Sequence, residues 1–366
     1  MKRALYFLAI IVTLIKAILS STNVNSILDA MVDKPKKEIF KVFHYLHKKE
    51  YKLESEEGLK RYRIFKENLK WINAKNAELG KQVYGMTQFI DLTHEEFKNS
   101  YLMKVNEMGS HISSMKANSN SFLSNSAEDK IDFDLMADSD EEIIQTNILN
   151  NNVTTIDWIP VMNKVKNQGS CGSCWAFAAV ATIEGQYHSK FGRLYDFSEQ
   201  YLVDCDNLDG GCNGGWPSNT YNWLSKNGVV EQRESPYKAK QGVCDKQVLK
   251  SKEFNIVQNF SMYDKDASMQ QGEWLNLLSK GPILVAMDAS DPGFGFYRPA
   301  GNESWVPASC GELNHAVVAV GYESVDGVEY LIVRNSWGED WGMNGNFRVK
   351  ASNSCGLMNF ACFRQL

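Results

Sequence analysis

The sequence has few histidines, no excess of basic residues and only one long apolar run. Lysine and arginine number 39 against 44 acidic residues, which gives a formal net charge of −5. A chain without a basic excess lacks the electrostatic footprint of a nucleic-acid binder, so we expect no nucleic-acid partner. No internal repeat is visible, which excludes a repeat architecture. With 366 residues, 43% of them hydrophobic, the chain is long enough for one large core or two smaller ones.

The single long apolar run lies at the N-terminus. Residues 4–15 are apolar except for Thr13 and follow Lys2 and Arg3. A basic start before a run too short to span a bilayer comfortably predicts a signal peptide, residues 1–20, cleaved between residues 17 and 21. An uncleaved anchor is the alternative. The eight cysteines agree with an oxidising compartment, so the sequence indicates the secretory pathway and no membrane segment after cleavage.

Residues 21–103 are rich in charge and predict helices. Asp33 is the expected N-cap of the first helix, with Pro35 in its first turn. A second helix, from about residue 55 to residue 79, carries six residues at steps of three or four, which places them along one stripe. They are Glu57, Arg61, Phe65, Asn68, Ile72 and Asn76. The simple interpretation is an amphipathic helix whose polar members are incidental.

A change of composition separates this region from the rest. Residues 104–151 are rich in serine and asparagine, and residues 128–142 contain eight acidic residues and one lysine. We interpret the stretch as a flexible, protease-accessible linker. Its apolar residues near position 145 leave open that part of it packs.

The densest chemical signal is Q-G-S-C-G-S-C-W-A-F, residues 168–177. An apolar helix is predicted after a turn, so Cys174 would lie at the first helical turn, where free N–H groups and the helix dipole favour a thiolate. Gln168 could point an amide N–H at the same place and stabilise an oxyanion. The alternative is a redox or zinc site built on Cys171 and Cys174.

The general base for Cys174 follows by elimination among six histidines. Four precede residue 152, in the part that we expect to be removed. His188 lies fourteen residues beyond Cys174 on the same predicted helix, about 21 Å away, which is too far for a hydrogen bond. His315, at the start of an apolar strand, remains. Asn335, in N-S-W-G, follows the next strand and could orient the imidazole, with Trp337 shielding that bond from water.

These motifs together resemble the papain/cathepsin cysteine peptidases. The six-residue stripe matches the interspersed E-R-F-N-I-N pattern of cathepsin L-type propeptides. Gly85, Phe89 and Asp91 resemble the G-x-N-x-F-x-D element that follows it, with Thr87 where asparagine is usual. The resemblance implies an α+β, papain-like two-lobe fold, with a helical lobe and an antiparallel β-barrel-like lobe, preceded by a helical propeptide domain. Residues 21–103 would be the inhibitory propeptide, residues 104–151 the linker and residues 152–366 the peptidase domain.

By the same resemblance, the chain is a secreted or lysosomal cysteine endopeptidase made as a zymogen. Gln168, Cys174, His315 and Asn335 would be catalytic, with no cofactor and no metal. The partners would be peptide or protein substrates and the chain's own propeptide, and the protein would be a monomer in a lysosome, a vacuole or the extracellular space. Acid would weaken propeptide ion pairs such as Glu57–Arg61 and start activation. A catalytically inactive papain-like binding or inhibitory protein stays open, as does a C-x-x-C redox or metal protein.

The resemblance also assigns the remaining site residues. Substrate binding would fall to Gly214, Gly215, Trp216, Pro217, Ala286, Asn314, Trp337 and Phe360. A ring at Phe360 would shorten the pocket for the residue two before the cut and favour Val or Leu there over Phe or Arg. The implied disulfides are Cys171–Cys212, Cys205–Cys244 and Cys310–Cys355. Cys362 would be a buried free thiol rather than a reactive or intermolecular one, and N-x-S/T triplets mark Asn152, Asn259 and Asn302 as glycosylation candidates.

Overall fold

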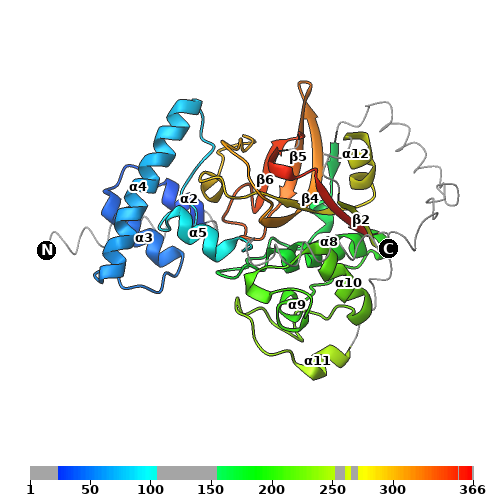
Figure 1. Cartoon of the computed structure of the whole chain (residues 1–366). Coiled ribbons are helices and arrows are strands. Elements are labelled where there is room, and N and C mark those ends of the chain that lie inside the picture. Colours follow the sequence, from blue (N-terminus) through cyan, green and yellow to red (C-terminus); the bar gives the residue numbers. More distant parts are fainter. Residues whose placement is uncertain (1–23, 105–154, 252–259, 265–270, 353, 365–366) are drawn as a thin grey trace. The chain divides into compact units, whose positions relative to one another are not determined.

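The computed structural model describes residues 24–104, 155–251, 260–264, 271–352 and 354–364 (Figure 1). They form two compact units. The first comprises the described residues up to Phe97 together with Pro292–Glu303 and Glu339–Gly345. The second contains Lys98–Asp291, Ser304–Gly338 and Asn346–Leu366, within the same limits. No helix in the described part of the chain has the length and apolar composition needed to cross a bilayer.

The first unit is helical. Its elements are α2 (Val24–Asp29), α3 (Lys36–Leu46), α4 (Glu56–Leu79), the start of α5 (His94–Tyr101) and the short helix η3 (Phe294–Phe296). Apolar residues three and four apart put one face of α3 against one face of α4, where Phe40 and Phe43 lie 5.2 Å and 5.6 Å from the ring of Phe65. The predicted second helix is confirmed, because Ser55 caps α4 by accepting the N–H of Gly58 at 3.1 Å. The predicted cap of the first helix is wrong: α3 begins at Lys36, and Pro35 rather than Asp33 is its N-cap residue.

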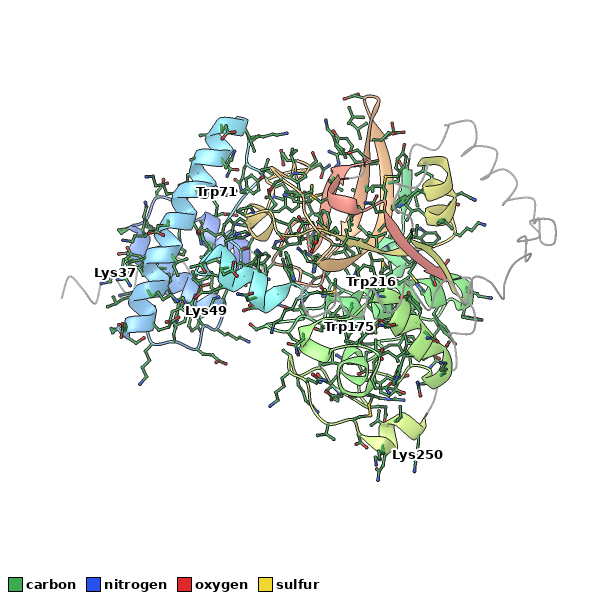
Figure 2. The ribbon with its side chains drawn as sticks, viewed as in Figure 1. Lys37, Lys49, Trp71, Trp175, Trp216 and Lys250 are labelled. Atoms are coloured by element: carbon green, nitrogen blue, oxygen red, sulfur yellow. A yellow bond between two sulfur atoms is a disulfide. The ribbon has the colours of Figure 1, made fainter. Side chains whose placement is uncertain are left out.

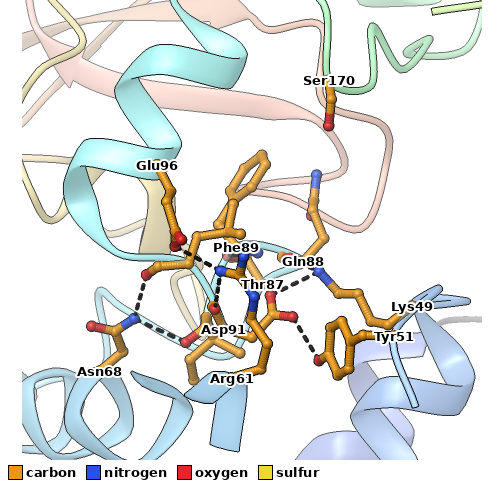
Figure 3. Close-up of polar contacts among 12 residues, drawn as sticks. Lys49, Tyr51, Arg61, Asn68, Thr87, Gln88, Phe89, Asp91, Glu96 and Ser170 are labelled. Atoms are coloured by element: carbon orange, nitrogen blue, oxygen red, sulfur yellow. Dashed lines mark hydrogen bonds and ion pairs between the residues drawn. The ribbon is translucent and has the colours of Figure 1, made fainter. Parts of the chain in front are cut away.

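The polar members of the α4 stripe are not incidental. Asn76 accepts the N–H groups of Val83 and Tyr84, both at 3.0 Å, and donates to the carbonyl of Tyr84 at 2.8 Å. Asn68 donates to the carbonyls of Ile90 and Leu92, both at 2.9 Å (Figure 3). One face of α4 therefore supplies the hydrogen bonds that hold the irregular segment at residues 83–92.

Ion pairs tie the far end of that segment to the helices. Arg61 pairs with Glu57 at 2.5 Å. It also pairs with Glu96 at 2.6 Å, and Asp91 binds Lys49 at 2.8 Å and the hydroxyl of Tyr51 at 2.7 Å (Figure 3). The buried Asp91 side chain thus has a cation and a hydroxyl as partners.

Glu96, which the sequence analysis did not single out, is the carboxyl with the clearest electrostatic signature. Burial acts to raise its pKa, but hydrogen bonds from Lys60, the Thr93 N–H and Arg61 outweigh it and lower the pKa to about 2. The carboxylate whose pKa is lowered in this region is therefore Glu96 of α5. It shares Arg61 with Glu57, the partner that the sequence suggested.

Two segments of the first unit, residues 85–87 and α2, contact loop residues from later in the chain. Thr87 donates its hydroxyl to the carbonyl of Gly295 at 2.7 Å, and Gly85 donates its N–H to Phe296 at 2.9 Å. A Cβ at Gly85 would lie 3.2 Å from the Arg298 side chain, so that side chain would have to shift to admit a larger residue. Arg298 is buried and pairs with Asp29 of α2. These contacts explain why Pro292–Glu303 belongs to this unit, although the sequence assigned it to another domain.

The second unit combines an antiparallel sheet with helices. The order of the sheet is β2-β7-β3-β4-β5-β6, and β1 pairs with β4. The strands are β1 (Thr155–Asp157), β2 (Phe260–Asp264), β3 (Ile283–Met287), β4 (His315–Val325), β5 (Val328–Arg334), β6 (Asn346–Lys350) and β7 (Phe360–Arg364). The continuous apolar run at residues 283–287 forms β3, and the apolar runs at residues 316–320 and 330–334 lie within β4 and β5.

The helices of this unit are led by α8 (Cys174–Phe191), which packs on β3 and β4. The others are α9 (Glu199–Cys205), α10 (Pro217–Asn227), α11 (Lys246–Ser251) and α12 (Gln271–Ser279), with short helices η1 (Ile159–Val161), η2 (Gly211–Asn213) and η4 (Ser354–Gly356). α8 is buried on most sides because its first turns are Ala-rich and lie between the sheet and α10. The predicted helix after Cys174 is therefore confirmed.

Candidate active site

Cys174 is the first residue of α8 and is fully buried. The turn before it is held by the disulfide Cys171–Cys212, and Trp175 donates its indole N–H to the carbonyl of Gly211 at 3.0 Å (Figure 2). Cys174 itself is a free thiol. Because Cys171 is bonded to Cys212, the two cysteines of C-x-x-C do not form a redox pair. Within the described ranges, no three His, Cys, Asp or Glu side chains lie close enough to hold a metal ion.

The first residues of β4 meet this helix terminus. The sulfur of Cys174 accepts the N–H of Ala316 at 3.4 Å, which places it beside the residue that follows His315. Ring nitrogen Nε2 of His315 lies 2.8 Å from Oδ1 of Asn335 and donates to it. Trp337 stacks on the imidazole, with ring centroids 4.9 Å apart. The elements α8, β4 and the turn after β5 thus bring Cys174, His315 and Asn335 into one buried cluster.

The side chain of Gln168 is held at both of its ends. Its Oε1 accepts the hydroxyl of Ser336 at 2.6 Å, and its Nε2 donates to the carbonyl of Cys171 at 2.8 Å. Since a hydroxyl bound to Oε1 orients the amide, the N–H face is turned toward the start of α8. Ser336 lies next to Asn335 and donates its N–H to the Asn335 side chain at 2.8 Å. The sequence analysis did not single out Ser336, although the motif N-S-W-G contains it.

Residues 101–104, here called the covering segment, lie over this cluster. The carbonyl of Tyr101 accepts from Nε2 of Gln168 at 3.1 Å. The N–H of Met103 donates to the carbonyl of Asn314 at 2.8 Å, and the N–H of Lys104 donates to the carbonyl of Asn213 at 3.1 Å. The side chain of Met103 is buried in the apolar cluster that contains Ala286 and Ala316. The Tyr101 carbonyl therefore accepts from the Gln168 amide, and the Met103 side chain lies in the neighbouring apolar cluster.

Burial sets the protonation of the central pair. It raises the pKa of the Cys174 thiol to about 12, although the N–H groups of Ala316, Trp175 and Cys174 itself act to lower it. It lowers the pKa of His315 to about 4, against the opposing hydrogen bond to Asn335. The thiolate that the sequence predicts at Cys174 is thus not favoured in the covered chain, because the desolvation penalty outweighs the helix-terminus effect.

The predicted substrate-binding residues lie in the second unit, around this cluster. Gly215 is buried against Trp175, so closely that a Cβ would lie 2.4 Å from the indole. Trp216 is the N-cap residue of α10 and Pro217 begins that helix. Asn314 donates to Asp288 at 2.7 Å and to the hydroxyl of Ser290 at 2.6 Å.

The four remaining predicted substrate-binding residues are Gly214, Ala286, Trp337 and Phe360. Gly214 is buried and has a positive φ of 130°, which favours glycine. Ala286 is buried on β3 opposite Ala316, and Trp337 is buried over His315. Phe360 begins β7, but its side chain lies outside the described residues.

The disulfides and sequons were also expected from the sequence. The structure contains Cys171–Cys212, Cys205–Cys244 and Cys310–Cys355, which is the implied pairing, and Cys362 is a buried free thiol. Asn302 is exposed. The signal peptide, the linker, Asn152 and Asn259 lie outside the described residues.

Comparison with known proteins agrees with this geometry. Residues 153–364 match the family model "Papain family cysteine protease", and residues 40–97 match "Cathepsin propeptide inhibitor domain (I29)". Cysteine proteinase 3 of Entamoeba histolytica is 34% identical over 82% of this chain and 85% of its own length. Chymopapain of Carica papaya is 33% identical over 82% of this chain and 79% of its own. The solved structure of digestive procathepsin L 3 of Tenebrio molitor aligns with a TM-score of 0.70 and 27% identity, over 90% of this chain and 99% of that one.

The chain belongs to the papain family of cysteine proteases. It has the family's fold of helices and an antiparallel sheet, and it carries a cathepsin-type inhibitory propeptide, so it is the zymogen of a thiol protease.

Proposed function

We propose that Cys174 is the nucleophile of this protease, His315 its acid and base, Asn335 the residue that orients His315, and Gln168 an oxyanion donor. The observation that carries the proposal is the contact of the Cys174 sulfur with the Ala316 N–H, at 3.4 Å, beside an imidazole bonded to Asn335 at 2.8 Å. Since Asn335 engages Nε2, the other ring nitrogen, Nδ1, serves the sulfur. This is the arrangement of nucleophile, base and orienting group that acyl transfer requires.

The mechanism follows from those positions. Once the covering segment leaves, water and substrate reach the pair, and the thiol proton passes to Nδ1 of His315. The sulfur attacks the peptide carbonyl, and the oxyanion accepts from Nε2 of Gln168 and from the N–H of Cys174, which is free as a first-turn helix donor. His315 returns the proton to the leaving amine as the C–N bond breaks. Water, deprotonated by His315, then hydrolyses the thioester and regenerates the thiol.

The covering segment accounts for latency. The Tyr101 carbonyl takes the place of the oxyanion at Gln168, and Met103 fills an apolar cluster beside it. In the fully buried pair, Cys174 is neutral and therefore a poor nucleophile. Since the propeptide is tethered to its enzyme, its effective concentration is of order mM, and modest contacts suffice for inhibition.

Met103 also supports the substrate preference expected from the sequence. Trp216 and Leu313 pack against the cluster in which it is buried, together with Ala286. A pocket lined in this way takes a medium-sized apolar side chain, so we place Val or Leu at the substrate position two before the cut. No insertion with paired histidines lies between Cys205 and Cys244, which favours endopeptidase over carboxy-dipeptidase activity.

The remaining assignments rest on the sequence. We place the signal peptide at residues 1–20, the propeptide at residues 21–103, the linker at residues 104–151 and the protease at residues 152–366. The protein enters the secretory pathway and acts as a monomer in a lysosome, a vacuole or outside the cell, with no nucleic-acid partner and with Asn302 open to glycosylation.

The test is labelling of Cys174 by an epoxysuccinyl thiol inhibitor after acid treatment, with hydrolysis of a peptide substrate followed in parallel. Stoichiometric labelling, loss of hydrolysis and absence of both in Cys174→Ala support the catalytic assignment. Cys362→Ala is the matched control, because it removes the other free thiol and is expected to change neither. Labelling without hydrolysis would favour a catalytically inactive binding or inhibitory protein instead.

A further inference from the structure

The hydroxyl of Tyr237 bridges two points of the backbone next to the proposed oxyanion donors. It donates to the main-chain carbonyl of Gln168 at 2.7 Å and lies 2.7 Å from the hydroxyl of Ser173, whose proton it accepts. Ser173 directly precedes Cys174. One phenol therefore connects the residue that carries the side-chain donor with the residue that precedes the main-chain donor.

The chain between these two residues needs such a connection. Gly169 has a φ of 58°, and a Cβ at Gly172 would lie 2.6 Å from the carbonyl of Cys212, so the turn depends on glycines. Glycines place few limits on backbone dihedrals. The turn, the disulfide at Cys171 and the bond from Nε2 of Gln168 to the Cys171 carbonyl also link the two donors, but Tyr237 connects Gln168 directly to Ser173, the residue before Cys174.

Tyr237 is itself held rigidly by other elements. Its ring meets Phe177 of α8 edge-on, with centroids 4.8 Å apart. The next residue, Lys238, donates its N–H to Oε1 of Gln200 on α9 at 2.7 Å, and Nε2 of Gln200 donates to the carbonyl of Lys240 at 2.9 Å. Burial raises the pKa of the Tyr237 hydroxyl well above its usual range, so the hydroxyl keeps its proton and remains a donor.

We propose that Tyr237 is a positioning residue that fixes the separation of the two oxyanion donors, Gln168 and the N–H of Cys174. The inference rests on the proposed catalytic roles of those residues. In the described structure, Tyr237 hydrogen-bonds neither the sulfur of Cys174 nor the ring of His315, so it acts on the geometry of the tetrahedral intermediate and not on the thiolate.

The first test compares Tyr237→Phe with the unmodified enzyme after activation. Hydrolysis of a peptide substrate is expected to lose about 10-fold in kcat, with KM within twofold, because the oxyanion forms after binding. A peptide aldehyde, which forms a tetrahedral adduct, is expected to bind about 10-fold more weakly. Alkylation of Cys174 by iodoacetamide, which forms no oxyanion, keeps its rate. Tyr201→Phe is the matched control, since it removes a buried hydroxyl bonded to the carbonyl of Asn227 at 3.3 Å.

The second test is a double-variant cycle. If Tyr237 acts through the oxyanion donors, adding Tyr237→Phe to Gln168→Ala slows kcat by no more than about twofold. Full additivity, or a parallel fall in alkylation, would overturn the proposal. Should Tyr237→Phe fold poorly, Ser173→Ala removes the other half of the bridge and must give the same pattern. If Gln168→Ala alone were fully active, the catalytic assignment of Gln168 would fail, a result distinct from failure of the bridge.

Discussion

Gln168 shows how strongly single residues of the site are constrained. Its main-chain N–H donates to Ser336 at 2.8 Å and its carbonyl accepts from Tyr237 at 2.7 Å, while both ends of the side-chain amide are also bonded. A donor fixed in this way needs no reorganisation when negative charge develops on a substrate oxygen, and such preorganisation is what lowers the barrier.

Replacing this side chain should therefore affect the rate more than the fold. We expect Gln168→Ala to lose ~100-fold in kcat, about 3 kcal/mol of barrier, with little change in KM. Steady-state kinetics of the activated enzyme and thermal unfolding provide the measurement. Gln186→Ala is the control, because Gln186 is also buried and donates to the carbonyl of Pro282 at 3.1 Å, away from the site. Near-normal turnover of Gln168→Ala would contradict the assignment.

Met103 supplies a second prediction at the scale of side chains. Met103 is buried in the apolar cluster that contains Ala286. If this cluster borders the proposed substrate pocket, we expect the enzyme to select Val or Leu over Phe or Arg two residues before the cut. A peptide library cleaved by the activated enzyme measures this preference. Ala286→Val narrows the pocket and is expected to shift the ratio toward Val. A profile dominated by Arg would refute the prediction.

At the scale of elements, the loop between α9 and α10 is organised by two aspartates. Asp209 accepts the N–H of Trp216 at 2.8 Å and the hydroxyl of Thr220 at 3.0 Å, so it holds both the glycine-rich stretch and the start of α10. Asp206 is buried beside it. Burial, reinforced by the Asp209 charge, raises the pKa of Asp206 to about 8, and burial raises the pKa of Asp209 to about 6. The two carboxyls are therefore expected to share one proton between about pH 6 and pH 8.

This shared proton makes the stability of the loop depend on pH. An aspartate with a raised folded pKa binds a proton that the unfolded chain releases above about pH 4, so stability is greatest below that pH and declines as pH rises through about 8. The asparagine in Asp206→Asn is neutral without binding a proton, so this variant does not lose that stability as the pH rises. We expect its stability relative to the parent to improve by about 1 kcal/mol per pH unit between pH 5 and pH 8. Melting temperatures of the activated enzyme at both pH values test this, with the exposed Asp245→Asn as control.

Elements with strong periodicity and a cap were predictable, and those set by distant contacts were not. The α4 helix was predictable from side chains that repeat at steps of three and four residues, and the structure adds its Ser55 cap. Asp33 was expected to cap α3 because its residue type is favoured at that position, whereas the helix begins at Lys36, after Pro35. Tyr101 and Tyr237 act through Gln168, which lies 67 and 69 residues away along the chain. A pattern within one helix, strand or turn does not predict contacts over such separations.

Among the described residues of the zymogen, His47 in the propeptide is well placed to sense acid. Its ring packs on Phe43 at 4.8 Å, and burial, reinforced by the charges of Lys49 and Arg298, lowers its pKa to about 3. A histidine with a lowered folded pKa stabilises the fold fully above about pH 6.5, and that stability is lost as pH falls toward 3. The stability that Glu96 provides, through its folded pKa of about 2, begins to be lost only when the pH falls below about 4.5.

Removing this titration should slow acid activation. Between pH 6.5 and pH 4.5, neutral His47 makes folding of the propeptide less favourable by on the order of 2 kcal/mol. We expect His47→Leu to activate about 10-fold more slowly at pH 4.5 and at an unchanged rate at pH 7. Gel analysis of zymogen conversion measures both rates. His44→Leu, which loses a bond to the carbonyl of Tyr51, is the control and is expected to slow neither.

The covering segment places one backbone carbonyl and one buried side chain at the proposed site. The Tyr101 carbonyl accepts from Nε2 of Gln168, and Met103 is buried in the apolar cluster that contains Ala286 and Ala316. If Gln168 holds the oxyanion as proposed, no substrate carbonyl can use this donor until the segment has left. We therefore expect product to appear only after an initial lag, and the lag should shorten when the propeptide has been cut beforehand.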